Sequence, residues 1–321
     1  MEATQRPDGR SPGEIAGEIA GLPRPRVMVS RCLLGDPVRY DGDHKQQPGL
    51  KAALESVATV VAICPEVEAG MPIPRPPVNL HVDAAGVAMI DIHGRDWTTS
   101  LITARAHRLH GHIDGLVLKS KSPSCGLSAI PRWSGHDERV VVGTGPGLFA
   151  EGALQHWPGV PATDERMLQD PLRCVDFLGR CVLSAGLRHA DEDDEVVHLL
   201  RAHALSWGLQ SRSLWRSVPK GRLHLSSLKR QMHLALGMQP RRRDHHWAVS
   251  QCRRVLGADL EPVMEAWLDG AAQLPEVWQG ARGLADKWLE EGRPVPEPVI
   301  RYLQMHLHLW ACIQRTPSAG L

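Results

Sequence analysis

The chain has 321 residues, of which 42% are hydrophobic and 23% charged, and its formal net charge at pH 7 is +1. This composition is ordinary for a soluble globular protein long enough for two domains, and a charge so near zero excludes a global attraction to nucleic acid or membranes. No apolar run approaches the roughly 20 residues that cross a bilayer. The polar N-terminus has no apolar segment of the signal-peptide kind. We therefore expect a cytoplasmic protein with a flexible tail over residues 1–24.

Short valine-rich runs in the first half predict the strands of a buried parallel sheet. Arg26–Ser30, Val57–Ile63 and Gly115–Leu118 are apolar and too short for helices. Weaker strand candidates and helical patterns lie between and after them: Gly86–Ile92 and Val140–Gly143 as strands, Pro48–Ser56, Thr98–Ile113 and Leu148–His156 as helices. Because strands and helices alternate, residues 25–160 predict an α/β domain with a mostly parallel sheet.

The second half of the chain has a helical pattern. After about residue 195 the strand patterns disappear, and leucine, alanine and tryptophan recur at intervals of three and four residues. The seven tryptophans of this half are expected to anchor a core rather than to stack on bases: Trp207, Trp215, Trp247, Trp267, Trp278, Trp288 and Trp310. We predict an all-α domain over residues 195–315, joined to the first domain by a linker over residues 161–194.

Three cysteines lie at or just beyond the ends of the predicted strands. Cys32 and Cys64 follow the first two directly, and Cys125 lies a short loop after the third. Because sites in open α/β sheets form beyond the carboxyl ends of the strands, these thiols are expected to converge. An odd number of widely spaced cysteines does not indicate a secreted disulfide framework, so they are buried thiols or metal ligands. For the other four we expect buried structural thiols: Cys174, Cys181, Cys252 and Cys312.

Polar side chains that could bind or orient a substrate surround each of these cysteines. The Cys32 loop carries Arg39, Tyr40, Asp41, His44 and Lys45, and the proline-rich Cys64 loop carries Glu66 and Arg75. Glu66 is a candidate acid or base, and Arg75 is expected to pair with Glu66 or to bind an oxyanion. Next to Cys125, two lysines favour a thiolate and three serines offer hydroxyls for hydrogen bonds: Lys119, Lys121, Ser120, Ser122 and Ser124.

The number of cysteines bears on the kind of metal centre. A structural zinc would be closed by a fourth cysteine or a histidine, and the nearest histidines, His44 and His81, have no zinc-finger spacing. A [4Fe–4S] cluster held by three thiolates leaves one iron open. Since iron is thiophilic, an open iron can take up a substrate sulfur as a Lewis acid. The pattern therefore favours a cluster with one open iron.

Four stretches of the first domain carry a resemblance to a known family. They are CLLGDPVRYDGDHK from residue 32, CPEVEAGMPIPRPP from residue 64, LKSKSPSCG from residue 118 and GTGPGLFAE from residue 143. Residues 25–155 resemble the thiouracil desulfidase (TudS-like) family. The resemblance implies a Rossmann-like fold, a cluster on Cys32, Cys64 and Cys125, and non-redox conversion of a thiolated base to the oxo-base with release of sulfide. It also implies that Glu66 and Ser122 carry proton-transfer roles.

The second domain leaves several hypotheses open. Residues 195–315 weakly resemble a YbgA-type helical domain of unknown function, with a degenerate histidine-rich helix around His198 and His203. The first hypothesis for the whole chain is a desulfidase acting on free 2-thiouracil or a related base. The second is desulfuration of thiolated tRNA, docked on Arg241–Arg243; residues 196–260 hold 12 Lys and Arg against 2 Asp and Glu. The third is a non-catalytic metal-binding or redox-sensing module.

Overall fold

The computed structural model describes residues 22–84, 86–134, 140–211, 225–256, 260, 262 and 273–314. Contacts within the chain separate two compact units: the described residues from Arg26 to Cys174 form the first, and those from Val175 onward, together with residues 22–25, form the second. Of the tail predicted over residues 1–24, residues 1–21 lie outside the described residues, as do Trp215 and Trp267.

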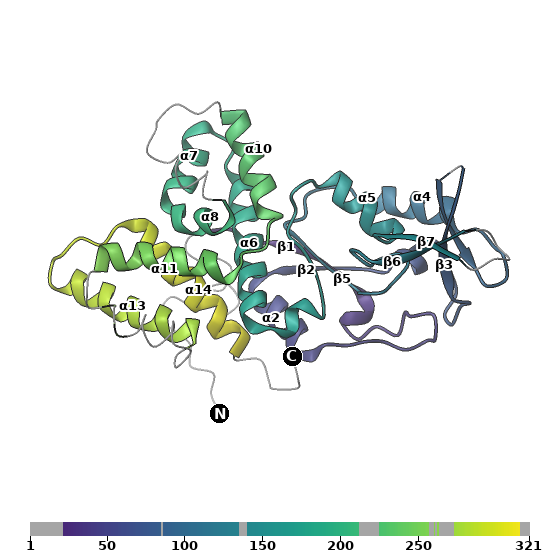
Figure 1. Ribbon diagram of the computed structural model, residues 1–321, viewed down its shortest axis with the longest axis horizontal. Helices are drawn as coiled ribbons and strands as arrows, with labels where there is room; N and C mark the ends of the chain where they lie inside the picture. The colour runs from purple at the N-terminus through teal and green to yellow at the C-terminus, as the bar shows by residue number, and fades with distance from the viewer. Residues whose placement is uncertain are drawn as a thin grey trace, which may run out of the picture. The chain divides into compact units, whose positions relative to one another are not determined.

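A four-stranded parallel sheet forms the centre of the first unit (Figure 1). Its order is β2-β1-β5-β8: β2 (Thr59–Ile63), β1 (Arg26–Ser30), β5 (Gly115–Leu118) and β8 (Ala162–Asp164). Every pair in it is parallel. Val27 and Val29 on one face of the central strand β1 and Met28 on the other are all buried, as a strand covered on both faces requires. The sequence predicted β1 and β5 to the residue.

A second, mixed sheet extends the first unit. Its order is β4-β3-β6-β7: β4 (Gly86–Asp91), β3 (Val78–Asp83), β6 (Ile130–Ser134) and β7 (Val140–Gly145). Strands β3 and β6 pair in parallel, and the two outer pairs are antiparallel. The sequence pattern predicted β4 and β7 but not β3 and β6, because β3 mixes polar and apolar residues and β6 contains Pro131.

Helices of the first unit pack on these sheets or begin directly at the site. They are η1 (Arg31–Leu33), α2 (Pro48–Val57), α3 (Pro65–Glu68), α4 (Thr98–Arg108) and α5 (Leu148–His156). Leu101 of α4 and Phe149 of α5 belong to the same buried core as Met28 of β1. Helix α4 ends earlier than the predicted Ile113, and Gly111 beyond its end adopts a left-handed φ of 81°.

The described residues of the second unit contain helices and no strand, as the sequence predicted. Its helices are α6 (Pro171–His189, which begins in the first unit), α7 (Asp193–Ala202), α8 (Ala204–Gln210), α10 (Leu225–Leu236), α11 (Arg242–Leu256), α13 (Leu274–Glu290) and α14 (Glu297–Gln314). Trp207 and Trp278 are buried in its core. The prediction of an α/β domain followed by a helical domain is therefore confirmed.

Two features of the region between the units differ from expectation. The segment predicted as a linker, residues 161–194, contains β8 and the whole of α6. Helix α6 is buried on all sides, because every residue from Cys174 to Leu187 is buried, so tertiary packing covers it along most of its length. The acidic run at its end serves as a helix start: Glu192 and Glu195 form the capping box of α7. No helix in the described part of the chain is both long and apolar enough to span a membrane.

Candidate functional site

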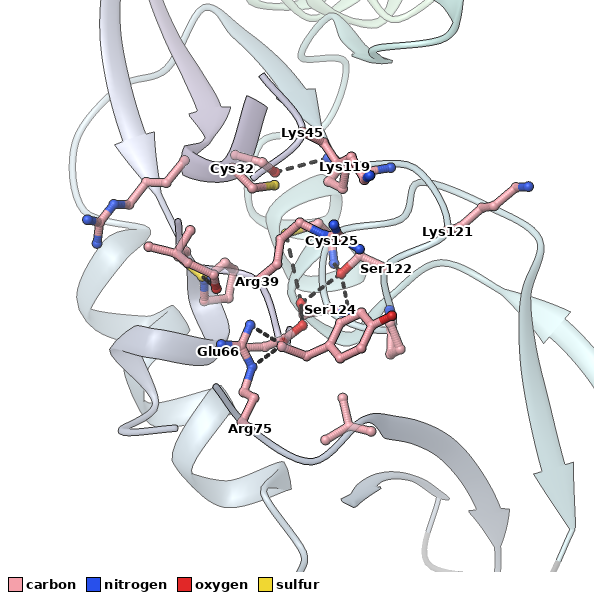
Figure 2. Close-up of a pocket in the computed structure, with 18 of the residues that line it drawn as sticks. Cys32, Arg39, Lys45, Glu66, Arg75, Lys119, Lys121, Ser122, Ser124 and Cys125 are labelled. Atoms are coloured by element: carbon pink, nitrogen blue, oxygen red, sulfur yellow. Dashed lines mark hydrogen bonds and ion pairs between the residues drawn. The ribbon is translucent and has the colours of Figure 1, made fainter. Parts of the chain in front are cut away.

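The three strand-end cysteines line one cavity of about 510 Å³ in the first unit (Figure 2). Cys32 lies in η1, directly after β1, and Cys64 follows β2 and precedes helix α3. Cys125 lies in the loop after β5, the strand that pairs with β1 on the side opposite β2. Because β2, β1 and β5 are parallel neighbours, their carboxyl ends deliver the three cysteines to the same edge of the sheet.

Burial and mutual proximity make these thiols hard to ionise by themselves. Burial, together with the neighbouring Cys64, raises the pKa of Cys32 to about 11, although Lys119 and Arg39 act in the opposite direction. Burial also raises the pKa of Cys64 and of Cys125, and the other two cysteines add to the rise at Cys125. Three thiolates here therefore need nearby positive charge to be stable.

Glu66 lies in α3, two residues after Cys64, and both of its oxygens are engaged. Arg75 donates to Oε2 from Nε at 2.8 Å and lies 2.7 Å from it through Nη2. Ser124 donates to Oε1 at 2.5 Å. Both side chains of the ion pair are buried, so the carboxylate has a defined orientation at the wall of the cavity. Of the two roles expected for Arg75, the structure shows the pairing with Glu66.

Ser122 is held by the backbone of its own loop. Its Oγ accepts the backbone N–H of Cys125 at 3.1 Å and that of Ser124 at 3.3 Å. It also lies 3.0 Å from Ser124 Oγ. The turn places Lys121 in a left-handed conformation with φ of 58°. Ser122 therefore lines the cavity, and the described hydrogen bonds connect it to Glu66 through Ser124.

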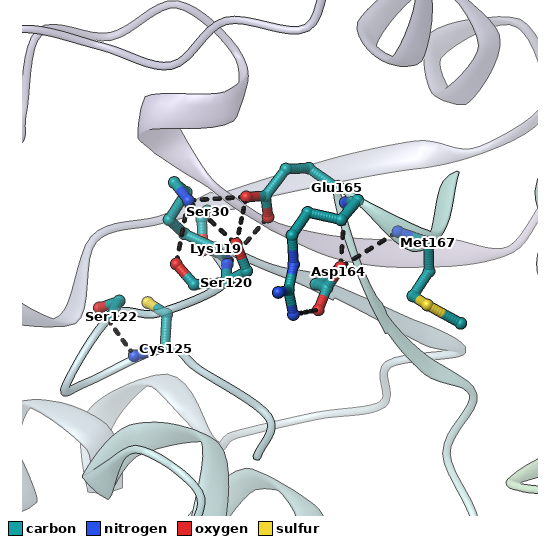
Figure 3. Close-up of polar contacts among 9 residues, drawn as sticks. Ser30, Lys119, Ser120, Ser122, Cys125, Asp164, Glu165 and Met167 are labelled. Atoms are coloured by element: carbon teal, nitrogen blue, oxygen red, sulfur yellow. Dashed lines mark hydrogen bonds and ion pairs between the residues drawn. The ribbon is translucent and has the colours of Figure 1, made fainter. Parts of the chain in front are cut away.

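A second polar network, centred on Glu165, holds the same loop (Figure 3). Glu165, just after β8, accepts Lys119 Nζ at 2.6 Å, the Ser120 backbone N–H at 2.8 Å and Ser120 Oγ at 2.5 Å. Burial alone would raise the pKa of Glu165, but the bonds from Lys119 and Ser120 hold it below its ordinary value. Ser30 accepts the Lys119 backbone N–H at 2.9 Å, and its hydroxyl lowers the pKa of Cys125 against the larger effect of burial.

The other predicted site residues divide into those that reach the cavity and those that do not. The first group is Arg39, Tyr40, Lys45, Arg75, Lys119 and Lys121, although the Lys121 side chain extends away from the cysteines in Figure 2. Asp41 and His44 do not line it, contrary to expectation. Asp41 pairs with Arg39 at 3.1 Å, and His44 Nδ1 accepts the Gln46 backbone N–H at 3.1 Å. Both side chains are occupied in stabilising their own loop.

Residues that the sequence analysis did not assign to the site also contribute. Asn79 of β3 and Ser30 of β1 line the cavity. Glu165 reaches the loop from a segment that was predicted to be a linker. No local signal marks these positions, because each acts through a partner more than 40 residues away or through a strand that the sequence did not show.

The donor set of the cavity bears on the cofactor that it could hold. Among the described residues no three His, Cys, Asp or Glu side chains are already arranged as a metal site. None of the seven cysteines, all of which the structure describes, is in a disulfide, and neither His44 nor His81 lines the cavity to supply a nitrogen ligand. Three thiols without a histidine do not fit a closed structural zinc site, whereas thiolate-only ligation fits an iron–sulfur cluster.

Comparisons with known proteins show what the first unit of the chain is similar to. The model of the family described as 2-thiouracil desulfurase matches residues 27–165, which include every residue of the cavity. The chain is 27% identical over 157 residues to "Uncharacterized protein YbbK" of Bacillus subtilis (strain 168), covering 46% of this chain and 99% of YbbK. It is 32% identical to the solved [4Fe-4S]-dependent thiouracil desulfidase TudS, covering 45% of this chain and 93% of TudS, with a TM-score of 0.36.

Proposed function

Because the chain belongs, through residues 27–165, to the 2-thiouracil desulfurase family, we propose that it is a [4Fe–4S]-dependent desulfidase of thiolated nucleobases. The reaction replaces C=S by C=O: the base and one water give the oxo-base and hydrogen sulfide, with no net electron transfer. The observation that carries the proposal is the convergence of Cys32, Cys64 and Cys125 on one cavity beside Glu66 and Ser122.

The three cysteines are the proposed ligands of the cluster. When bound, a cluster with three protein ligands supplies an open iron, a thiophilic Lewis acid for the substrate sulfur. Nearby cations offset the negative charge of the thiolates only in part: Lys119 and Arg39 act on Cys32, and Arg75 acts on Cys64. Binding to a cluster would therefore stabilise the three thiolates. A cytoplasmic location is part of the proposal, because seven cysteines without a disulfide among them suit a reducing compartment.

The rest of the cavity is suited to one heteroaromatic ring. Its volume of about 510 Å³ is that of a small-molecule site. Tyr40 is 45% exposed beside Arg39, whose guanidinium lies 5.4 Å from the ring centroid, so the phenol offers a face on which a base can stack. Asn79 offers both a donor and an acceptor to the polar edge of a pyrimidine.

Glu66 and Ser122 are the proposed proton-transfer residues. Attack by water requires a base, and the departing sulfur requires a proton. The carboxylate of Glu66 is held by Arg75 and lines the cavity, and Ser122 presents a hydroxyl to the same space. The two side chains therefore supply the acid–base chemistry that the exchange of sulfur for oxygen needs.

Sulfide release from 2-thiouracil by the anaerobically reconstituted full chain tests this function. We expect release by the wild type, and loss of both cluster and release in Cys32→Ala, Cys64→Ala and Cys125→Ala. Glu66→Gln is expected to keep the cluster and lose turnover, whereas a non-catalytic metal module would be indifferent to this change. Activity that survives the loss of any of the three thiols would contradict the proposal.

Thiolated tRNA is the second candidate substrate. Arg241 and Arg243 are exposed at the start of α11, in the basic part of the helical unit. If they dock RNA, replacing Arg241, Arg242 and Arg243 by alanine should weaken tRNA binding and reduce its salt dependence, and leave turnover of free 2-thiouracil unchanged. Binding that is indifferent to the three arginines would remove this candidate.

A further inference from the structure

Ser124 lies between the two proposed proton-transfer residues. Its Oγ is 2.5 Å from Glu66 Oε1 and 3.0 Å from Ser122 Oγ, and its side chain is 1% exposed. Ser124 therefore fills the gap between the carboxylate and the hydroxyl that faces the cavity (Figure 2).

The hydrogen bonds of this chain have a defined direction. Ser124 has a single hydroxyl proton, and a carboxylate can only accept, so that proton lies toward Glu66. The alternative acceptor, Cys125 Sγ, is 3.8 Å away and much weaker. Because Ser124 has no second proton to give, Ser122 must be the donor in the bond between the two serines.

We propose that Ser124 is a positioning residue that relays a proton from Ser122 to Glu66. The inference rests on the proposed desulfidase function. When the attacking water gives a proton to Ser122 Oγ, Ser122 passes its own proton to Ser124 Oγ, and Ser124 passes its own to Glu66 Oε1. Three O–H bonds break and three form; the water becomes hydroxide and the carboxylate becomes a neutral acid. The reverse passage protonates the departing sulfur and restores all three side chains.

The surrounding loop supports negative charge at Ser122 during this transfer. The backbone N–H groups of Ser124 and Cys125 both point to Ser122 Oγ. Two donors on one oxygen form a small oxyanion site, which stabilises charge that develops there. The loop backbone therefore donates to Ser122 Oγ at one end of the relay, and Arg75 donates to Glu66 Oε2 at the other end.

Helix α5 also holds Ser124 in place, through hydrogen bonds to its backbone carbonyl. Its backbone N–H groups at Phe149 and Ala150 donate to the Ser124 carbonyl at 3.0 and 3.1 Å. A Cβ at Gly147 would lie 2.6 Å from the Ser124 carbonyl carbon and oxygen, so only glycine allows this approach. This contact gives the GTGPGLFAE motif a physical role: it holds Ser124 at hydrogen-bond distance from Glu66.

The relay is tested by kinetics of the reconstituted full chain with 2-thiouracil. Ser124→Ala should lower kcat by about 10²- to 10⁴-fold, the usual contribution of acid–base catalysis, with KM and iron content unchanged. Ser128→Ala is the matched control, because this serine is exposed in the same loop, and its kcat should equal that of the wild type. In the double variant Ser124→Ala/Glu66→Gln, kcat should fall no further than in Glu66→Gln alone, since both changes break one pathway.

The outcomes separate the relay from the function. No sulfide release by the wild type from any thiolated base would remove the desulfidase function and the relay with it. Release by the wild type together with full activity of Ser124→Ala would overturn the relay alone. Independent, multiplicative losses in the double variant would also overturn it, because they would show that Ser124 acts on folding or binding rather than through Glu66.

Discussion

Two polar networks meet at the Cys125 loop, and they use the same kinds of groups for different purposes. The relay network joins Glu66, Arg75, Ser124 and Ser122. The anchor network joins Glu165 to Lys119 and Ser120. Each contains a buried carboxylate, a cation and a serine. The carboxylate of the relay network lines the cavity, whereas Glu165 does not.

The difference lies in where the hydrogen bonds lead. Those of the relay network continue from Glu66 through Ser124 to a hydroxyl in the cavity, whereas those of the anchor network return to the loop backbone, at Ser120 N. Function is therefore expected to depend on the relay network and stability on both networks. The residue types of the two networks do not distinguish them, whereas the connectivity of their hydrogen bonds does.

The largest effect on stability is expected at the buried ion pair of the relay network. Arg75→Ala leaves the buried carboxylate of Glu66 without its cation, so the free energy of unfolding should fall by about 3–5 kcal/mol. Arg108→Ala is the matched control, because Arg108 pairs with Glu68 of the same helix while 47% exposed, and about 0–1 kcal/mol is expected. Urea unfolding of both variants measures the difference. Equal losses would contradict the assigned roles of burial and pairing.

The carboxylate of the anchor network is expected to matter for stability more than for turnover. Glu165→Gln keeps the shape of the side chain but removes the charge that Lys119 and Ser120 bind, so unfolding should become easier by about 1–3 kcal/mol. Its kcat should change less than tenfold, in contrast to the loss expected for Glu66→Gln. A Glu165→Gln variant as inactive as Glu66→Gln would erase the distinction between the networks.

The pH dependence of stability gives a third test of the anchor network. The pKa of Glu165 is held below its ordinary value of 4.5 in the folded chain. The folded state therefore binds this proton less readily than the unfolded chain, so the contribution is complete above about pH 4.5 and is lost as pH falls through the folded pKa. Unfolding curves between pH 3 and 7, a range of about four units, should show a smaller acid-induced loss in Glu165→Gln. Parallel curves for the two proteins would contradict the lowered pKa.

The smallest effect is expected from Ser120→Ala. It removes one hydroxyl donor to Glu165 and leaves the Lys119 bond and the backbone bond in place, so about 1 kcal/mol of stability should be lost. Thermal unfolding of Ser120→Ala, Glu165→Gln and the wild type under the same conditions measures this loss. A loss well above that of Glu165→Gln would show that the hydroxyl, rather than the carboxylate, organises this network.

The sequence predicted the parts of the fold that rest on uninterrupted apolar runs. Strands β1 and β5 are buried and valine-rich, so their bounds and the cysteines beyond them could be located. Strands β3 and β6 were not predicted because they are partly polar, with Pro131 in β6, and β8 was not predicted because it has only 3 residues. Because β8 was not predicted, nothing in the sequence indicated that Glu165 would contact the loop that carries Cys125.

Within the loops, the sequence identified candidate residues but did not show which side chains point into the cavity. Asp41 and His44 are as polar and as close to Cys32 in sequence as Lys45, yet only Lys45 lines the cavity. Ser122 and Ser124 are both near Cys125, and only the fold shows which one contacts Glu66. Such distinctions depend on turns and on contacts between distant segments, which residue type and spacing do not encode.

Iron and acid-labile sulfide per chain, measured after anaerobic reconstitution, test the central claim most directly. Wild type and the control Cys252→Ser, a buried thiol of the helical unit, should both hold one [4Fe–4S] cluster per chain. Cys32→Ser, Cys64→Ser and Cys125→Ser should each lose it. A wild type that takes up no iron, or a cluster that persists when any one of these three thiols is absent, would contradict the account.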